Sequence, residues 1–307
     1  MAAFCVLIVH YNGWFVGGVP EQIDLTEVSA FRLTQSVIAS ATCICVNMFL
    51  IISGYFGIRL RWESVVKICL LLLMIYVPCY IARGFFDHTF DGWGLAKQFL
   101  VFTRAGYFIQ CYMMLMFLSP VLNAAVEKYG RKILPWTIAF LVIEFWFDCI
   151  TKVDNLSFNS GYSVIHFVLM YMIARVCFLY KEEIIKVDRK LWVVDYVVLT
   201  SLIWLLYIIR VKWWNWYSNP IVVLSSVCTF LPFIYSHSYN KTINWLAQGV
   251  LAVYIIQVAQ PFHAALVKID NYTLVSYSYP LYLACMLGVI VDFSSLAQSM
   301  ETSVCLS

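Results

Sequence analysis

Charged side chains are scarce in this chain of 307 residues, since Lys, Arg, Asp and Glu make up only 12% of it. A soluble domain carries about 25% charged residues. The formal net charge is only +3, and the cations are spread through short segments, so the sequence gives no sign of a nucleic-acid partner. The scarcity of charge argues against a soluble globular domain and predicts a protein embedded in a lipid bilayer.

Motifs with a defined chemistry are also missing. The chain has no CxxC pair, P-loop or GxGxxG turn, which argues against the common metal-binding and nucleotide-binding sites, and we expect no metal. Its 11 Cys lie mostly in apolar runs, as small buried side chains do, rather than in a disulfide framework. No basic residue precedes the first apolar run. We therefore interpret residues 1–16 as a membrane span that has lost its leading residues, not as a signal peptide.

Long apolar runs are abundant. Hydrophobic residues make up 63% of the chain, and its mean hydropathy is +0.82. A spanning helix needs about 20 apolar residues, and helices satisfy the backbone of such runs in lipid. We therefore predict an all-α, polytopic transmembrane helix bundle of about ten spans, without a soluble domain, that forms one membrane-embedded domain over residues 1–307. The predicted spans are 1–16, 36–58, 64–83, 105–125, 133–150, 161–180, 191–210, 217–236, 246–266 and 275–294.

The distribution of cations among the loops predicts how the bundle is oriented. Loops after the even-numbered spans hold 12 of the 20 Lys and Arg residues. Cytoplasmic loops carry the excess of these residues in membrane proteins. We therefore expect a multi-pass protein of the inner (plasma) membrane with both termini in the cytoplasm.

His10 lies within the first apolar run, where the other ionisable side chains are Cys5 and Tyr11. An ionisable group inside a span is costly, and it usually faces a protein interior or a water-filled cavity. Imidazole titrates near neutral pH and can pass a proton in either direction. Two interpretations therefore stay open, a histidine that carries chemistry or transport and a histidine hydrogen-bonded inside the bundle.

The end of the second span is a further candidate site. Ser53-Gly-Tyr55 is followed closely by Arg59 and Arg61. A hydroxyl, a phenol and two guanidinium groups fit a mouth for an anionic cofactor, because Arg forms bidentate contacts with phosphate. The alternative is ordinary helix packing by small residues together with cations that mark a cytoplasmic loop.

Polar side chains within three later spans have two interpretations each. A stripe in the fourth span predicts a cavity-facing surface or an aromatic belt at the membrane interface. A pair one turn apart in the ninth span predicts substrate contact or hydrogen bonding between helices. Glu144 lies in the fifth span, where a carboxylate usually has a polar partner within the protein or a functional role. The fourth-span stripe comprises Arg104, Tyr107, Gln110 and Tyr112, and the ninth-span pair comprises Tyr254 and Gln257.

Five segments together resemble, in order, the acyltransferase-3 family of integral membrane O-acyltransferases. Ala2–His10 is similar to the family's first span, which ends in a histidine, and Val46–Phe56 is similar to its Ser-Gly-Tyr segment. The other three segments are Tyr107–Pro120, Gly161–Tyr171 and Asn244–Gln257. The resemblance implies transfer of an acyl group, typically acetyl from acetyl-CoA, to a hydroxyl of a bacterial cell-envelope polysaccharide or lipid-linked glycan.

The resemblance also implies roles for single residues. His10 would deprotonate the sugar hydroxyl, a contribution of about 10²–10⁴-fold in rate, or assist relay of the acyl group. Two alternatives stay open, a multi-pass transporter or flippase for a glycan or small solute and an inactive, truncated family member. The expected donor-binding residues are Arg59, Arg61 and Lys67 at the CoA phosphates and Ser53 and Tyr55 along the thioester channel, and the expected acceptor-binding residues are Arg104, Gln110, Tyr254 and Gln257.

Overall fold

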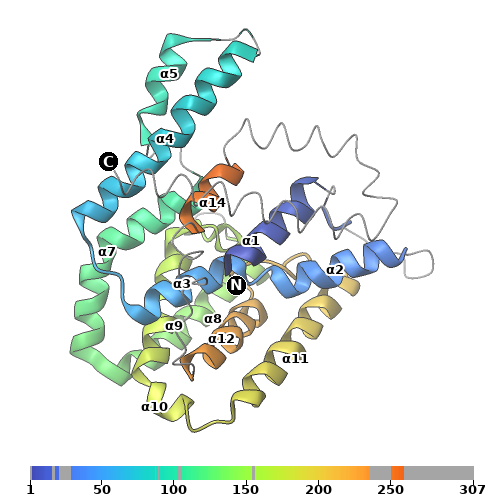
Figure 1. The fold of residues 1–307 in the computed structure, drawn as a ribbon. Helices are drawn as coiled ribbons and strands as arrows, with labels where there is room; N and C mark the ends of the chain where they lie inside the picture. Colours follow the sequence, from blue (N-terminus) through green and yellow to red (C-terminus); the bar gives the residue numbers. More distant parts are fainter. Residues whose placement is uncertain are drawn as a thin grey trace.

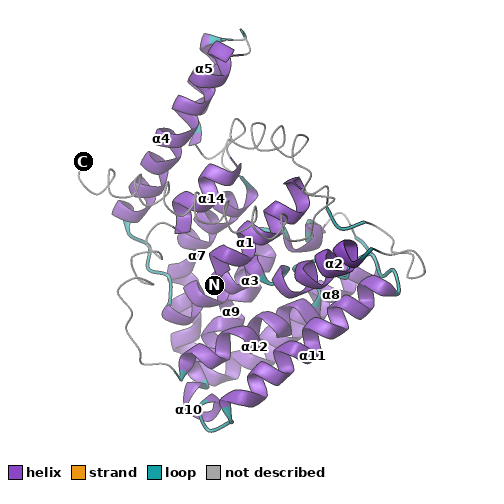
Figure 2. Cartoon of the chain, turned by 45° about the vertical axis from the view of Figure 1, so that its right-hand side comes forward, coloured by secondary structure: helices purple, strands orange, loops and turns teal. Residues whose placement is uncertain are grey.

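The computed structural model describes residues 2–15, 18–20, 29–86, 88, 90–101, 106–153, 156–235 and 250–258, which form helices and loops without a strand (Figures 1 and 2). The all-α prediction is confirmed for these residues. Two π-helical segments, η1 (Tyr11–Phe15) and η3 (Trp146–Ile150), continue α1 and α8. The α-helices are α1 (Ala2–His10), α2 (Ala30–Thr42), α3 (Cys45–Phe56), α4 (Trp62–Phe86), α5 (Gly92–Gln98), α7 (Tyr107–Tyr129), α8 (Leu134–Phe145), α9 (Val164–Leu179), α10 (Lys181–Ile184), α11 (Arg189–Ile208), α12 (Pro220–Ile234) and α14 (Val250–Val258).

Four helical stretches in the described part of the chain are long and apolar enough to cross a membrane. The membrane helix bundle is thus supported, whereas the predicted number of about ten spans is not confirmed. Some of the predicted spans are shorter apolar helices in the structure. In addition, the predicted span 275–294 lies outside the described residues. The four long stretches are Ala30–Phe56, Trp62–Phe85, Tyr107–Ile150 and Arg189–Ile208, and the shorter helices are Ala2–Gly13, Val164–Leu179 and Pro220–Ile234.

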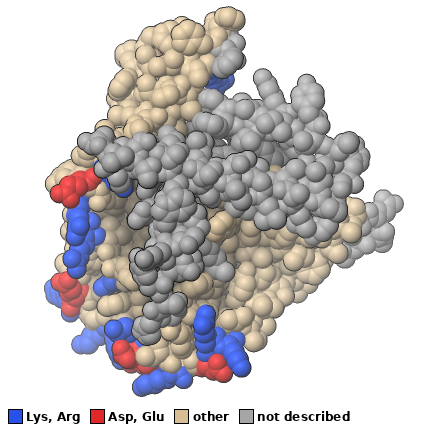
Figure 3. All heavy atoms as spheres, in the orientation of Figure 1, with Lys and Arg blue, Asp and Glu red and all other residues tan. Residues whose placement is uncertain are grey.

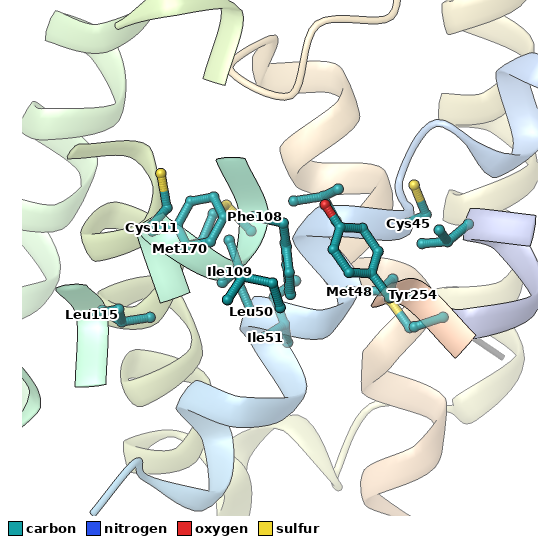
Figure 4. Packing of buried hydrophobic residues seen from close by; sticks show 14 of the residues in the cluster. Cys45, Met48, Leu50, Ile51, Phe108, Ile109, Cys111, Leu115, Met170 and Tyr254 are labelled. Carbon is teal, nitrogen blue, oxygen red and sulfur yellow. The ribbon is translucent and has the colours of Figure 1, made fainter. Parts of the chain in front are cut away.

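Helix α3 lies at the centre of the bundle (Figure 1). It packs against α1, α9 and α12, while α7 packs on α9 and α11 packs on α12. Met48, Leu50 and Ile51 of α3 are at most 1% exposed, and Figure 4 shows them in the same cluster as Phe108 of α7 and Tyr254 of α14. Between helices in lipid, close van der Waals packing of this kind is a main source of association.

Helices α3 and α9 run side by side in the same direction. Near their N-terminal ends, His166 Nε2 lies 2.9 Å from Asn47 Oδ1. Near their C-terminal ends, Arg175 donates a 3.1 Å hydrogen bond to the carbonyl of Tyr55, which satisfies one of the free carbonyls at the end of a helix. A Cβ added to Gly54 would lie 2.7 Å from the Cβ of Ala174. Glycine at position 54 therefore lets these two helices pack closely at this point.

The local sequence accounts for where several helices begin and end. The side chains of Ser163, Asp188 and Asn219 accept hydrogen bonds from backbone amides in the first turns of α9, α11 and α12, which is the role of an N-cap residue. Helices α3 and α7 stop at Gly57 and Gly130, whose φ angles are +79° and +52°. Glycine adopts such angles without the steric cost that other residues meet.

Charged side chains gather at the periphery of the bundle. In Figure 3 most of the visible Lys, Arg, Asp and Glu lie along the lower and left-hand edges of the view, around α10 and beside α4 and α7. Arg131 and Glu183 form an ion pair, with 2.6 Å between the guanidinium nitrogen and the carboxylate oxygen. The orientation of the termini stays a prediction from the cation distribution among the loops.

Candidate functional site

His10 stands at the junction between α1 and the π-helical segment η1. Such segments are rare and frequently occur at functional sites. The half-buried imidazole lines a cavity of about 260 Å³, together with Ser53 of α3 and Tyr254 of α14. The rings of His10 and Tyr254 lie 6.3 Å apart, centroid to centroid. The structure thus brings three of the predicted site residues together in one chamber, which we call the His10 cavity.

A second cavity, of about 410 Å³, lies between the end of α3 and the first turns of α4. Arg59 and Lys67 line it, so its wall carries two cations. It shares Ser53, Tyr112 and Leu251 with the His10 cavity. The Tyr112 hydroxyl donates a 3.3 Å hydrogen bond to Ser53 Oγ at this junction. The two spaces are therefore neighbours that these side chains separate, and we call the second one the cationic cavity.

The other predicted site residues lie elsewhere. Arg61 is exposed, and it is not among the described residues that line either cavity. Tyr55 packs edge-on against Phe178 and Phe230, at centroid distances of 5.5 and 5.1 Å, and Gln110 is exposed on α7. Two further residues complete the set: Arg104 lies outside the described residues, and Gln257 is described only as part of the helix α14.

A buried polar network lies at the N-terminal end of the α3–α9 pair. His166 Nδ1 lies 3.1 Å from both carboxylate oxygens of Glu144, and Nε2 lies 2.9 Å from Asn47 Oδ1. Asn47 in turn donates a 3.1 Å hydrogen bond through Nδ2 to the carbonyl of Tyr217. All three side chains of the network are 0% exposed. Buried polar groups of this kind are stable only when their partners satisfy them.

The donors and acceptors of this network determine how many protons it holds. Because Asn47 uses its amide nitrogen toward Tyr217, its Oδ1 accepts, and His166 donates through Nε2. Nδ1 then either carries a second proton toward the carboxylate or accepts the proton of a neutral Glu144. In both cases the Glu144–His166 pair holds two protons and is neutral as a whole. The sequence predicted that the carboxylate of Glu144 needs a partner, whereas Asn47 and His166 were not among the predicted site residues.

The network also fixes a residue of the His10 cavity. Tyr217 lines this cavity with its side chain while its carbonyl accepts the hydrogen bond from Asn47 and its amide donates to the carbonyl of Ser160. Tyr217 is not among the predicted site residues. It begins the predicted span 217–236, whereas the structure places it in the loop before α12. Its only signal is the excess of tyrosine in the chain.

The described residues contain no group of three His, Cys, Asp or Glu side chains that could hold a metal ion. The helices and the cavities define an integral membrane protein with a histidine-lined cavity next to a cation-lined one. A family model described as an acyltransferase domain matches residues 1–296, and the chain belongs to the acyltransferase-3 family. Neither the curated proteins nor the solved structures give a match. The family match supports a membrane acyltransferase.

Proposed function

We propose that this protein transfers an acetyl group from acetyl-CoA to a hydroxyl of a cell-surface or lipid-linked carbohydrate. The observation that carries the proposal is the shared wall of the two cavities, where Ser53, Tyr112 and Leu251 line both spaces. One space presents a half-buried histidine and the other presents two cations, Arg59 and Lys67. A donor that carries phosphates at one end and a reactive thioester at the other fits this pair of spaces.

The cationic cavity suits the phosphate end of the donor. A guanidinium binds phosphate through parallel hydrogen bonds, and an ammonium binds it as a point charge. The acyl end would pass Ser53 and Tyr112 into the His10 cavity, whose wall is mainly apolar and aromatic. We further propose that the cationic cavity faces the cytoplasm of the inner membrane, because cytoplasmic loops carry the excess of Lys and Arg.

The proposed step uses His10 as a general base. As the sugar hydroxyl oxygen attacks the thioester carbonyl carbon, the imidazole takes the hydroxyl proton. The new C–O bond forms, the C–S bond breaks, and the thiolate leaves with the electron pair. The imidazolium then returns the proton to the thiolate, so the products are the O-acetyl ester and CoA. General-base assistance of this kind contributes about 10²–10⁴-fold.

The experiment compares His10→Asn with His88→Asn in purified, full-length protein reconstituted into liposomes. His88 is exposed and is not among the residues that line the two cavities, so it is a matched control. Release of free CoA thiol from acetyl-CoA is followed with and without oligosaccharides from the surface glycan of the source cells. We expect His10→Asn to lower acceptor-dependent release by about 10²–10⁴-fold and His88→Asn to retain it.

Two outcomes would reject the proposal. If a folded His10→Asn variant is as active as the wild type, His10 is not the general base. Solute flux across the liposome membrane without any consumption of acetyl-CoA favours the transporter instead. The mass of the glycan with and without the intact gene gives an independent measurement, because a difference of one acetyl group reports both the donor and the type of reaction.

A further inference from the structure

A third cavity, of about 760 Å³, is lined by residues of η3, of the loop that follows it and of the start of α9. It is larger than the His10 cavity and the cationic cavity, and the proposed donor does not use it. Ser163, the N-cap of α9, lines it. Because α3 and α9 run in the same direction, this cavity lies at the opposite end of the pair from Arg59. We call it the loop cavity.

The loop cavity has a polar wall with aromatic side chains set into it. Trp216 and Tyr162 supply flat apolar faces, and Ser157 and Asn159 supply exposed hydrogen-bonding groups. The ammonium of Lys152 lies 5.2 Å from the centroid of the Trp216 ring. Sites for small ligands combine apolar and aromatic surface with a few well-placed polar groups in this way.

The charges on this wall oppose each other, in contrast to the cationic cavity. One acidic side chain, Asp148, and one basic side chain, Lys152, line the loop cavity. Asp148 is 8% exposed, and its two oxygens accept hydrogen bonds from Ser218 Oγ at 2.5 Å and from the amide of Ser160 at 3.1 Å. Each carboxylate oxygen thus accepts a hydrogen bond from within the protein. The wall suits an uncharged, hydroxyl-rich ligand better than a polyphosphate.

The backbone around the loop cavity is unusual. Six non-glycine residues of the described chain have positive φ angles, and four of them line this cavity. Their φ angles lie between +50° and +58°, a region that bulky residues rarely adopt. Asp148 itself lies in the π-helical segment η3. Strained backbone clusters at ligand sites because surrounding contacts must hold it in place. The four residues are Lys152, Ser157, Asn159 and Ser160.

A thin aromatic layer separates the loop cavity from the His10 cavity. Tyr162 lines the loop cavity, and its ring lies 4.6 Å from the ring of Tyr107 and 5.1 Å from that of Tyr217, centroid to centroid. Both of these tyrosines line the His10 cavity. A ligand held in the loop cavity is thus one side-chain layer from the chamber of the proposed base, on the side away from the donor.

We propose that the loop cavity binds the carbohydrate acceptor, with a sugar ring stacked on Trp216 and its hydroxyls on the polar loop that contains Ser157 and Asn159. This assignment rests on the proposed function for its chemistry. Its geometry is independent of that function, since it concerns binding of a saccharide by residues that do not touch the donor. Lys152 would move from the face of Trp216 when the sugar ring takes that place.

The binding experiment uses full-length protein in nanodiscs without any acyl-CoA. The probe is a set of oligosaccharides released from the surface polysaccharide of the source cells, observed by saturation-transfer NMR and titrated by tryptophan fluorescence. Trp216→Ala is compared with Trp216→Phe, which keeps an aromatic face, and with Trp213→Ala. Trp213 is the matched control, because it lies in the same loop but packs against Phe145 at 5.6 Å, centroid to centroid.

We expect wild type and Trp213→Ala to bind the oligosaccharides and Trp216→Ala to bind about tenfold or more weakly, as removal of a central Trp contact does. Trp216→Phe should recover part of the affinity. Unchanged binding by a folded Trp216→Ala variant would overturn the proposal, and so would the absence of saccharide binding to the wild type. Asn159→Gly gives a second variant that is expected to weaken binding without a change in folding, because glycine keeps the positive φ of this position and removes only the amide side chain.

Kinetics separate failure of this inference from failure of the proposed function. If acetyl transfer occurs, Trp216→Ala should raise KM for the acceptor about tenfold and leave KM for acetyl-CoA unchanged. Transfer with an unchanged acceptor KM rejects the loop cavity while the function stands. Saccharide binding that depends on Trp216, in a protein that transfers no acetyl group, rejects the function while the loop cavity stands.

Discussion

His166 Nδ1 lies 3.1 Å from both carboxylate oxygens of Glu144, in a position where neither side chain has any exposed surface. The pair joins α8 to α9, and through Asn47 it reaches α3 and the carbonyl of Tyr217. A polar network that links three packed helices fixes their relative positions, because each donor has one acceptor that fits. The wall of the His10 cavity is therefore supported from behind by this pair.

We expect Glu144→Ala to destabilise the protein by about 3–5 kcal/mol, as loss of one partner of a buried pair does. Glu144→Gln should cost much less, because the carboxamide can donate to Nδ1 while Nε2 still donates to Asn47. Thermal unfolding in detergent, followed by cysteine reactivity or circular dichroism, measures both. Equal losses for the Ala and Gln variants would contradict the proposed arrangement of protons.

Neutralising the cationic cavity should weaken donor binding. In Arg59→Gln/Lys67→Gln, KM for acetyl-CoA is expected to rise about tenfold or more, since hydrogen bonds to charged groups contribute about 1.5–3 kcal/mol each. KM for the acceptor should stay the same. Steady-state kinetics with each substrate varied in turn gives both values. Arg61→Gln is the control, because Arg61 is exposed and not among the residues that line this cavity, and an equal effect of that variant would move the donor site.

A large side chain at the junction of the two cavities should separate donor binding from turnover. Ser53→Leu is expected to lower kcat by about tenfold or more while the phosphate end of the donor still binds, because the acyl end can no longer reach His10. Ser201→Leu on α11 is the control, since Ser201 is exposed and donates a hydrogen bond to the carbonyl of Val197 one turn earlier in the same helix. Unchanged turnover in a folded Ser53→Leu variant would show that the acyl group takes another path.

Enlarging Gly54 should force α3 and α9 apart. A Cβ at this position would lie 2.7 Å from Ala174 Cβ and 3.0 Å from the carbonyl oxygen of Tyr171, so Gly54→Ala is expected to cost about 1–3 kcal/mol through overpacking. Gly92→Ala is the control, because nothing lies within 4 Å of a Cβ there. Unfolding temperatures in detergent compare the two. A Gly54→Ala variant as stable as Gly92→Ala would contradict the close approach of the helices.

Parts of the site were predictable from single residues in their apolar context. His10 and Glu144 stand out because an ionisable group inside an apolar run requires a protein or water environment. Ser53, Arg59 and Lys67 follow from the end of a span beside a basic loop. Tyr55 was predicted to lie with them, yet it packs against Phe178 and Phe230. Neighbours along a helix point in different directions, so adjacency in sequence did not place Ser53 and Tyr55 in the same space.

The number of spans was less predictable than the helical class. Hydropathy identifies apolar runs, but it does not distinguish a helix that crosses the bilayer from a shorter one held inside the bundle. Helices α9 and α12 have 16 and 15 residues, and their surroundings are other helices. A short helix is stable there because buried side chains, Ser163 in α9 and Asn219 in α12, satisfy the free amides at its N-terminal end.

The sequence by itself determined that this chain is a helical membrane protein, because charge is scarce and the apolar runs have the length of spanning helices, whose backbone hydrogen bonds are satisfied within the segment. It also determined that His10 and Glu144 need partners. Only the tertiary structure decided which partners these are, and that the His10 cavity adjoins the cationic cavity on one side and the loop cavity on the other. Those relations depend on how helices far apart in the chain pack, through contacts such as Gly54 against Ala174 and Asn47 against His166, which no local pattern specifies.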